Sequence, residues 1–287
     1  MKLINIIAAA ALGVAITAPS QAQQLTGTLA KIDKSGEIVI GHRESSVPFA
    51  YLDENRKPVG YSMDLCAKIV DAVAAELGKE LKVRYVPVNP KTRIALMANG
   101  TIDLECGSTT NNLTRQQQVE YLPTTFVTGT KLLVRKGSGI SSVKDLAGKV
   151  IALAQGTTNE RAVKAAAEKL GIEFKVLPVR DHAEGMLSLE TDRVDAYSTD
   201  HILLYGLIAK SKNPDDFEVV GDFLSFDPYA LMVRRDDSAF ELIGKKTLAE
   251  VFRSGEIDTI YDKWFKPLGV EQTELLRAAF RLGALPK

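Results

Sequence analysis

Charged side chains follow strand-like runs at several points along the chain, where they could bind a small charged molecule. Arg43 follows "GEIVIG", Arg93 follows "RYVPV", and Asp200 follows "RVDAYS". A guanidinium offers a fork of donors that matches a carboxylate, and an aspartate can receive an ammonium group. Each residue taken alone would fit a solvated loop at least as well, so the prediction of a binding site depends on the whole set.

Hydroxyl groups and one imidazole stand at corresponding places. Ser108 and Thr110 follow "TIDLECG", Thr158 follows "VIALA", and His182 follows "KVLPV". The free backbone N–H groups at the start of a helix form an anion site, and the helical run after "AQGTT" offers such a start. Threonines at helix starts are more often simple caps, so this motif is a weak signal by itself.

Arg115 lies in the first turn of a short predicted helix. Thr114 heads that helix, with Gln117 three residues further on, which is the spacing of a capping box. The helix dipole mildly opposes a cation at this position, so a purely structural arginine would gain little from it. We therefore favour an anion-binding role for Arg115 over a surface role.

The number of donors predicts a ligand with two negative groups. One α-carboxylate and one α-amine account for Arg115 and Asp200, which leaves Arg43, Arg93 and His182 near the same cleft. Unpaired charges in a closed, dry cleft are costly, so a second anionic group on the ligand is expected. Arg93 and His182 could equally be exposed residues at helix starts.

An α/β fold must bring these residues together. Short strand-like runs alternate with longer helical runs, the pattern of an α/β fold with largely parallel sheets. The second half repeats the first when Pro87 is aligned with Pro178 and Asp103 with Asp195, although chance similarity is an alternative. Ligands of open α/β sheets bind beyond the carboxyl ends of the strands, so two similar lobes would share one cleft.

Two extended segments mark the expected lobe boundaries. Residues 126–137 and 226–237 are extended and apolar and end in basic residues, so we expect the chain to cross there from one lobe to the other and back. The first lobe then comprises residues 23–127 and 231–287, and the second comprises residues 128–230.

The first 22 residues have the features of an export signal. Lys2 provides a positive start, an apolar run follows, and "SQA" before Gln23 is a small-residue cleavage site. The apolar run has about 15 residues, short of the roughly 20 that a membrane span needs. We expect a mature chain that begins near Gln23 and lies in the periplasm.

Composition argues against several classes of function. The 287 residues contain 36 Lys and Arg and 36 Asp and Glu, so no overall basic field exists to hold nucleic acid or an anionic membrane. The three histidines are widely separated and lack metal-ligand spacing. We expect a monomer without metal or cofactor.

The two cysteines are expected to form a disulfide. Cys66 lies on the apolar stripe of a predicted helix, and Cys106 alternates with Ile102 and Leu104 on one face of a predicted strand. Both thiols would point toward a contact between helix and sheet in an oxidising compartment. Two buried free thiols are the alternative, because the sequence does not supply the geometry.

The sequence resembles the periplasmic amino-acid-binding proteins of ATP-driven importers (solute-binding family 3) over nearly the whole mature chain. "ECGSTTNN" and "GHRESSVPF" are specific to the glutamate/aspartate-binding branch, whereas "QGTT" and the "DKW" tail occur across the family. The resemblance implies a two-lobed periplasmic-binding-protein (type II) fold. Each lobe would be a mixed, mostly parallel sheet flanked by helices, and two crossing segments would join the lobes.

The resemblance also implies a role for each candidate residue, with L-glutamate or L-aspartate as the ligand. Arg115, Thr110 and Thr158 would hold the α-carboxylate, Ser108 and Asp200 the α-ammonium group, and Arg43, Arg93 and His182 the side-chain carboxylate.

Two positions bear on which ligand is bound. Binders of cationic amino acids in this family have an acidic residue where Arg43 stands, which favours an acidic ligand here. Pro90 stands where the branch usually has a serine, three residues before Arg93. One hydroxyl contact is therefore lost, and the choice between glutamate, aspartate and another dicarboxylate stays open.

The implied function is capture and delivery without catalysis. Two lobes would close on the ligand, and the closed form would dock on the membrane permease of an ABC importer. The family also includes periplasmic cyclohexadienyl dehydratases, for which His182 and Glu184 could serve as acid and base, but the sequence shows no nucleophile–base pair. A free ligand-binding protein used in signalling is a third possibility.

Overall fold

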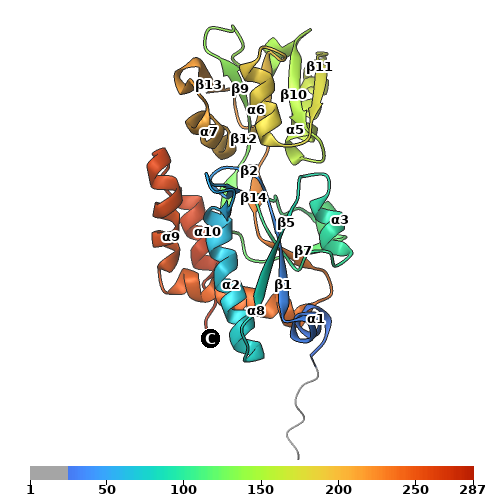
Figure 1. The fold of residues 1–287 in the computed structure, drawn as a ribbon. Helices are drawn as coiled ribbons and strands as arrows, with labels where there is room; N and C mark the ends of the chain where they lie inside the picture. The colour runs from blue at the N-terminus through green and yellow to red at the C-terminus, as the bar shows by residue number, and fades with distance from the viewer. Residues whose placement is uncertain (1–24) are drawn as a thin grey trace, which may run out of the picture.

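A computed structural model describes residues 25–287, which form two lobes one above the other (Figure 1). Each lobe is built on one five-stranded sheet. The export signal expected at residues 1–22 lies outside the described residues. Among residues 25–287, no helix combines the length and the apolar character that crossing a membrane requires.

The sheet of lobe 1 has the strand order β5-β1-β6-β15-β7. Its strands are β1 (Glu37–His42), β5 (Lys82–Pro87), β6 (Leu104–Cys106), β7 (Val119–Tyr121) and β15 (Met232–Arg234). Strand β1 pairs in parallel with β5 and β6, whereas β15 pairs antiparallel with β6 and β7.

The sheet of lobe 2 repeats this arrangement in the order β11-β10-β12-β9-β13. Its strands are β9 (Thr130–Arg135), β10 (Val150–Ala154), β11 (Lys175–Val179), β12 (Ala196–Asp200) and β13 (Phe217–Val220). Strand β10 is parallel to β11 and β12, and β9 is antiparallel to β12 and β13. The predicted similarity of the two halves is confirmed, and each sheet is mixed.

Two aspartates that the sequence repeat aligned make equivalent hydrogen bonds in the two lobes. The Asp103 carboxylate accepts a hydrogen bond from the Val39 N–H at 3.0 Å, and the Asp195 carboxylate accepts one from the Val150 N–H at 2.7 Å. Each bond joins the middle parallel strand of its sheet, β1 or β10, to the residue directly before the next parallel strand, β6 or β12. The match extends from strand order to individual side chains.

Helices cover both faces of each sheet (Figure 1). In lobe 1 they are α1 (Gly27–Ser35), α2 (Tyr61–Leu77), α3 (Arg93–Ala98), α4 (Leu113–Gln116), α8 (Ser238–Arg253), α9 (Glu256–Phe265) and α10 (Glu274–Gly283), with the 3-10 helix η3 (Lys266–Leu268). In lobe 2 they are α5 (Thr158–Leu170), α6 (His182–Glu190) and α7 (His201–Lys210), with the 3-10 helices η1 (Val143–Leu146) and η2 (Pro214–Asp216).

Two short strands connect the lobes side by side. Strand β8 (Phe126–Thr128) pairs antiparallel with β14 (Asp227–Tyr229), at the two segments expected to be crossings. An aromatic cluster in the core of lobe 1 anchors this ribbon: the Phe49 ring lies 5.0 Å from Phe126 and 5.1 Å from Tyr229 between centroids. The Tyr229 hydroxyl then reaches the site described below.

A small three-stranded sheet lies at the edge of lobe 1 that faces lobe 2. It consists of β2 (Ser45–Ser46), β3 (Ala50–Leu52) and β4 (Pro58–Val59). The chain then enters α2 through Gly60, whose φ is 138°. A Cβ at Gly60 would lie 2.2 Å from the Phe49 carbonyl oxygen, so only glycine fits this turn.

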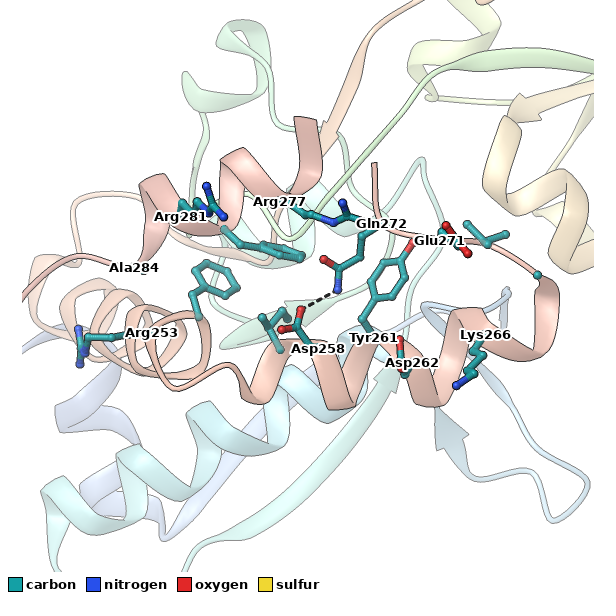
Figure 2. A pocket seen from close by; sticks show the side chains of 15 residues that line it. Arg253, Asp258, Tyr261, Asp262, Lys266, Glu271, Gln272, Arg277, Arg281 and Ala284 are labelled. Carbon is teal, nitrogen blue, oxygen red and sulfur yellow. Dashed lines mark hydrogen bonds between the residues drawn. The ribbon is translucent and has the colours of Figure 1, made fainter. Parts of the chain in front are cut away.

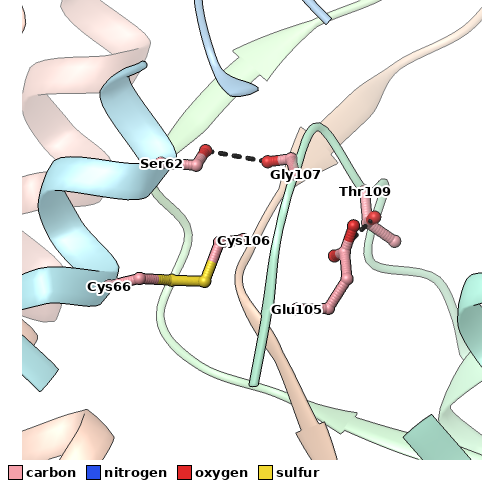
Figure 3. Close-up of a disulfide and its surroundings, with 6 residues drawn as sticks. All are labelled: Ser62, Cys66, Glu105, Cys106, Gly107 and Thr109. Carbon is pink, nitrogen blue, oxygen red and sulfur yellow. Dashed lines mark hydrogen bonds between the residues drawn. A yellow bond between two sulfur atoms is a disulfide. The ribbon is translucent and has the colours of Figure 1, made fainter. Parts of the chain in front are cut away.

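A disulfide joins helix α2 to strand β6, as expected (Figure 3). It links Cys66 to Cys106, both of which are buried. Close by, the Ser62 hydroxyl donates to the Gly107 carbonyl at 2.8 Å. These two contacts hold the end of β6 against α2, and the loop that carries Ser108 and Thr110 begins there.

Loss of this disulfide is expected to lower the free energy of unfolding by about 4 kcal/mol. The two cysteines are 40 residues apart, and the estimate follows from the chain entropy that a bridge of that span removes from the unfolded state. Urea unfolding of the wild type and of the Cys66→Ala/Cys106→Ala variant measures the difference. Reductant should destabilise the wild type and leave the double variant unchanged; equal responses of the two would contradict a stabilising bridge.

Candidate functional site

A narrow pocket lies where the two lobes meet. It contains every predicted ligand residue except Arg115, and its lining comprises Arg43, Pro90, Arg93, Ser108, Thr110, Thr157, Thr158, Asn159, His182, Asp200 and Leu203. Its free volume of about 10 Å³ is about the size of one water molecule. An amino acid could therefore enter only if the lobes move apart.

The lining residues stand at the carboxyl ends of the parallel strands of both sheets. In lobe 1, Arg43 follows β1, Arg93 starts α3 after β5, and Ser108 follows β6; in lobe 2, Thr158 starts α5 after β10, His182 starts α6 after β11, and Asp200 ends β12. The equivalent strand ends of two similar sheets thus face each other, which is the placement that the sequence predicted.

Arg93 is buried and is linked by hydrogen bonds to an acidic residue that the sequence prediction did not include. Its Nη1 donates to the Thr109 hydroxyl at 2.6 Å, and that hydroxyl donates to Glu105 at 2.8 Å. Glu105 and Thr109 lie side by side at the end of β6 (Figure 3). Burial and then the nearby charges of Arg115 and Arg43 lower the pKa of Arg93 to about 10, so it stays cationic at neutral pH.

Arg43 already has a carboxylate partner in the other lobe. Its side chain is 1% exposed, and its Nη2 forms an ion pair with Asp181, the N-cap residue of α6. Burial raises the pKa of Asp181, but the Arg43 charge and the His182 N–H lower it more, to about 2. Asp181 is therefore ionised. Its position directly before His182 at a helix start is the sequence signal that could have revealed it.

Arg115 lies behind the pocket instead of on its surface. Its Nη1 donates to the Thr110 carbonyl at 2.8 Å, and its Nη2 donates across to the Gly156 carbonyl of lobe 2 at 3.2 Å. It is buried, with 6% of its surface exposed. Arg115 is thus close to the site and fixes the backbone of both lobes, although the pocket itself is lined by its neighbours.

The capping box predicted at Thr114 is wrong. The N-cap of α4 is Asn112, whose side chain accepts a hydrogen bond from the Arg115 N–H at 3.0 Å. Asn112 has the extended backbone of an N-cap residue, with φ −150° and ψ 159°. Asparagine is as good a cap as threonine or better, so the helix begins two residues earlier than the threonine suggested.

Asp200 lies in an acidic, fully buried environment. It accepts hydrogen bonds from Asn159 at 2.9 Å and from the Tyr229 hydroxyl. Burial, followed by the negative charge of Asp227, raises the pKa of Asp200 to about 7. Asp227 in turn accepts a hydrogen bond from Thr110 at 2.9 Å. Two carboxylates in this position would stabilise a cationic group bound beside them.

His182 is neutral at physiological pH. Burial and the charges of Arg43 and Arg93 lower its pKa to about 3. Its Nδ1 shares a hydrogen bond with the Tyr197 hydroxyl at 2.7 Å, whereas its Nε2 has no hydrogen-bond partner among the described atoms. His182 is therefore a neutral hydrogen-bonding group. It does not belong to the surplus of positive charge that the sequence analysis considered.

The charges around the site are more balanced than the sequence suggested. The argument for a second anionic ligand group counted Arg43 and Arg93 as unpaired cations. The structure pairs Arg43 directly with Asp181 and Arg93 with Glu105 through Thr109. Unpaired charge alone therefore does not establish a dicarboxylate ligand, and the unpaired hydrogen-bonding atoms become the stronger argument.

Four lining residues carry buried polar atoms that no described atom satisfies. These atoms are Arg43 Nε, Arg93 Nε, Ser108 Oγ and His182 Nε2. A buried polar atom without a partner costs about 1–3 kcal/mol, and most buried polar atoms in proteins are paired. Their concentration on one pocket indicates a ligand with several polar groups.

A larger groove lies on lobe 1, between α8, α9 and α10 (Figure 2). Its volume is about 950 Å³, and none of the predicted residues line it. Arg277 and Asp262 show that its charges are of both signs, and Gln272 donates to Asp258 at 2.8 Å within it. Because the charged groups between the lobes are buried and converge from both sheets, we assign the functional site there.

Residues 38–267 match the family of bacterial extracellular solute-binding proteins, family 3. The chain belongs to this family. It is 46% identical over 265 residues (91% of this chain and 87% of the relative) to an L-glutamate/L-aspartate-binding protein of Pseudomonas aeruginosa. It is 42% identical over 267 residues (92% and 88%) to a glutamate/aspartate import solute-binding protein of Escherichia coli strain K12.

A solved structure agrees with this assignment. An ancestral arginine-binding protein bound to glutamine superposes with a TM-score of 0.71 at 32% identity, covering 80% of this chain and 98% of that one. The type II periplasmic-binding-protein fold is thus confirmed. The two curated relatives are named as a binding protein and as an import solute-binding protein. With the family match, this supports a solute-binding protein and not the dehydratase-like alternative.

Because the pKa of Asp200 is raised, the Asp200→Asn substitution is expected to increase the free energy of unfolding by an amount that depends on pH. Its pKa is raised from 3.8 to about 7, so the stability that the protonated form contributes is fully present below 3.8 and is lost as pH rises through 7. Asparagine mimics the protonated form at every pH. In urea unfolding, the stability of the variant relative to the wild type should rise by about 1.4 kcal/mol per pH unit between about pH 4 and pH 7, where only the folded state binds the proton, and should stay constant above pH 7.

The exposed Asp192 provides the control, since its side chain is 76% exposed. Asp192→Asn should show the same difference from wild type at pH 5 and pH 8. An equally flat difference for Asp200→Asn would contradict a raised pKa.

Proposed function

We propose that this protein captures L-glutamate or L-aspartate between its two lobes and delivers it to the membrane permease of an ABC importer. The observation that carries the proposal is the cluster of unpaired buried polar atoms on Arg43, Arg93, Ser108 and His182. The four residues that carry these atoms line one small pocket together with Asp200. The names of the relatives, which bind glutamate and aspartate, support the same ligand class.

An acidic amino acid would satisfy both ends of this pocket. Its ammonium group suits Asp200 and the Ser108 hydroxyl. Its side-chain carboxylate can accept from the free Nε atoms of Arg43 and Arg93 and from His182, if the imidazole proton is on Nε2. The Tyr197 hydroxyl favours that tautomer, because burial raises the pKa of Tyr197 and keeps its proton available to Nδ1.

The α-carboxylate is assigned to Thr110, Thr158 and Arg115. The two threonine hydroxyls come from opposite lobes and lie 3.3 Å apart. Arg115 is directly behind them, bound to the Thr110 carbonyl. A carboxylate that enters between the threonines would accept from both hydroxyls and be attracted by the guanidinium. Pro90 lines the pocket and offers no hydrogen-bond donor. The part of the pocket assigned to the ligand side chain therefore has one hydroxyl fewer than expected with the serine of the glutamate/aspartate-binding branch.

Binding requires the lobes to separate and close again on the ligand. The β8–β14 ribbon is the natural hinge, because it connects the lobes. The lobe bounds that we propose are residues 23–127 with 231–287 for lobe 1 and residues 128–230 for lobe 2. Residues 1–22 are proposed as the export signal that would direct the protein to the periplasm, and a monomer is proposed as the delivering form.

A thermal-shift screen of the chain from Gln23 onward tests the ligand class directly. Because bound ligand stabilises the folded state according to its affinity and concentration, L-glutamate and L-aspartate should raise the melting temperature most. Glutamine and asparagine are the matched controls, since they differ only in the side-chain amide. A larger shift with a neutral or cationic amino acid, or none with any amino acid, would refute the proposal.

The Arg43→Met substitution is expected to weaken glutamate binding by at least about 2 kcal/mol, or about thirtyfold in Kd. Methionine keeps much of the volume but removes the donors for the side-chain carboxylate. The affinity for glutamine should fall less, because the glutamine side chain has no charge for Arg43 to balance. Calorimetry measures both affinities.

Arg84→Met is the control for Arg43→Met. Arg84 lies on the neighbouring strand β5, is 48% exposed and pairs with Glu37, so its loss should leave both affinities unchanged. Equal losses for glutamate and glutamine in Arg43→Met would show that Arg43 does not contact the side-chain carboxylate.

A further inference from the structure

The ion pair between Arg43 and Asp181 connects the two lobes at the edge of the pocket. Arg43 follows β1 in lobe 1, and Asp181 caps α6 in lobe 2. Beside them, the Ala183 N–H of lobe 2 donates to the Ser45 hydroxyl of lobe 1 at 3.2 Å. Two short segments, 43–45 and 181–183, thus form a continuous contact between the lobes.

The same Asp181 oxygen is held from two sides. Asp181 Oδ1 accepts from Arg43 Nη2 and, at 2.6 Å, from the His182 N–H. The free atoms Arg43 Nε and His182 Nε2 belong to these same two partners, and both residues line the pocket. A ligand carboxylate that accepts from those free atoms would therefore lie near the Asp181 carboxylate, and the Arg43 guanidinium would be a partner of both negative charges.

We propose that Asp181 is a specificity-determining residue that shares Arg43 with the side-chain carboxylate of the ligand. This inference rests on the proposed function. The two carboxylates compete for one guanidinium. Asp181 therefore weakens the binding of an acidic amino acid relative to its amide. Asp181 also neutralises Arg43 when the lobes are in contact, which an arginine that is 1% exposed requires.

These two effects of Asp181 can be separated by comparing ligands. The contact between lobes contributes to closure on any amino acid, so its loss changes all affinities in the same direction and by similar factors. Repulsion between carboxylates acts on glutamate and not on glutamine, because glutamine is neutral at the same atoms. The ratio of the two dissociation constants therefore reports the repulsion alone.

The Asp181→Asn variant tests this inference. Asparagine has nearly the same shape and is an equally good N-cap, so α6 should be preserved while the charge is removed. The ratio Kd(glutamine)/Kd(glutamate) should rise at least about tenfold over the wild type, since like charges at close range cost several kcal/mol. Calorimetry gives the glutamate affinity, and displacement of labelled glutamate gives the glutamine affinity. Aspartate and asparagine form a second pair.

The control is Asp192→Asn, which makes the same charge change in the same lobe and breaks an exposed ion pair with Arg135. Its ratio should equal that of the wild type. An unchanged or lower ratio in Asp181→Asn overturns the inference, while a wild type that binds neither glutamate nor aspartate overturns the proposed function instead. If circular dichroism shows that Asp181→Asn is misfolded, Asp181→Ser, which also removes the charge and retains a cap, decides the question by the same ratio.

Discussion

The central constraint on this structure is the burial of three guanidinium groups where two lobes meet. Each of Arg43, Arg93 and Arg115 is at most 6% exposed, and a buried charge without compensation costs several kcal/mol. The protein compensates each in a different way: an ion pair to Asp181, a hydroxyl relay to Glu105, and two backbone carbonyls. The free hydrogen-bonding atoms that remain define what the pocket can recognise.

The duplicated α/β architecture makes this arrangement possible. Each lobe presents three parallel strand ends, and the loops after them carry donors in lobe 1 and both donors and a carboxylate in lobe 2. The disulfide between Cys66 and Cys106 and the aromatic cluster around Phe49 fix the lobe 1 loops and the ribbon. The two sheets thus hold the polar groups, and the β8–β14 ribbon connects the lobes.

Much of the site was predictable because strand ends can be located from sequence. The runs before Arg43, Arg93 and His182 are short and apolar, so the position of each following residue at a sheet edge follows from the fold class. The capping of α4 was not predictable in the same way, since Asn112 and Thr114 are both acceptable caps and backbone geometry chooses between them. Arg115 was correctly placed near the site, but its direct partners are backbone carbonyls of both lobes.

The sequence by itself determined the α/β class and the polar residues at the strand ends, because these depend on local periodicity and on residue type. It favoured the internal repeat and the pairing of Cys66 with Cys106 but left an alternative to each. Only the tertiary structure decided how the charges are paired. Asp181, Glu105 and Asp227 come from separate segments, and their distances to Arg43, Arg93 and Asp200 depend on how loops from both lobes pack. Electrostatic energies change steeply with distance and burial, so residue types alone do not fix the charge state of the site.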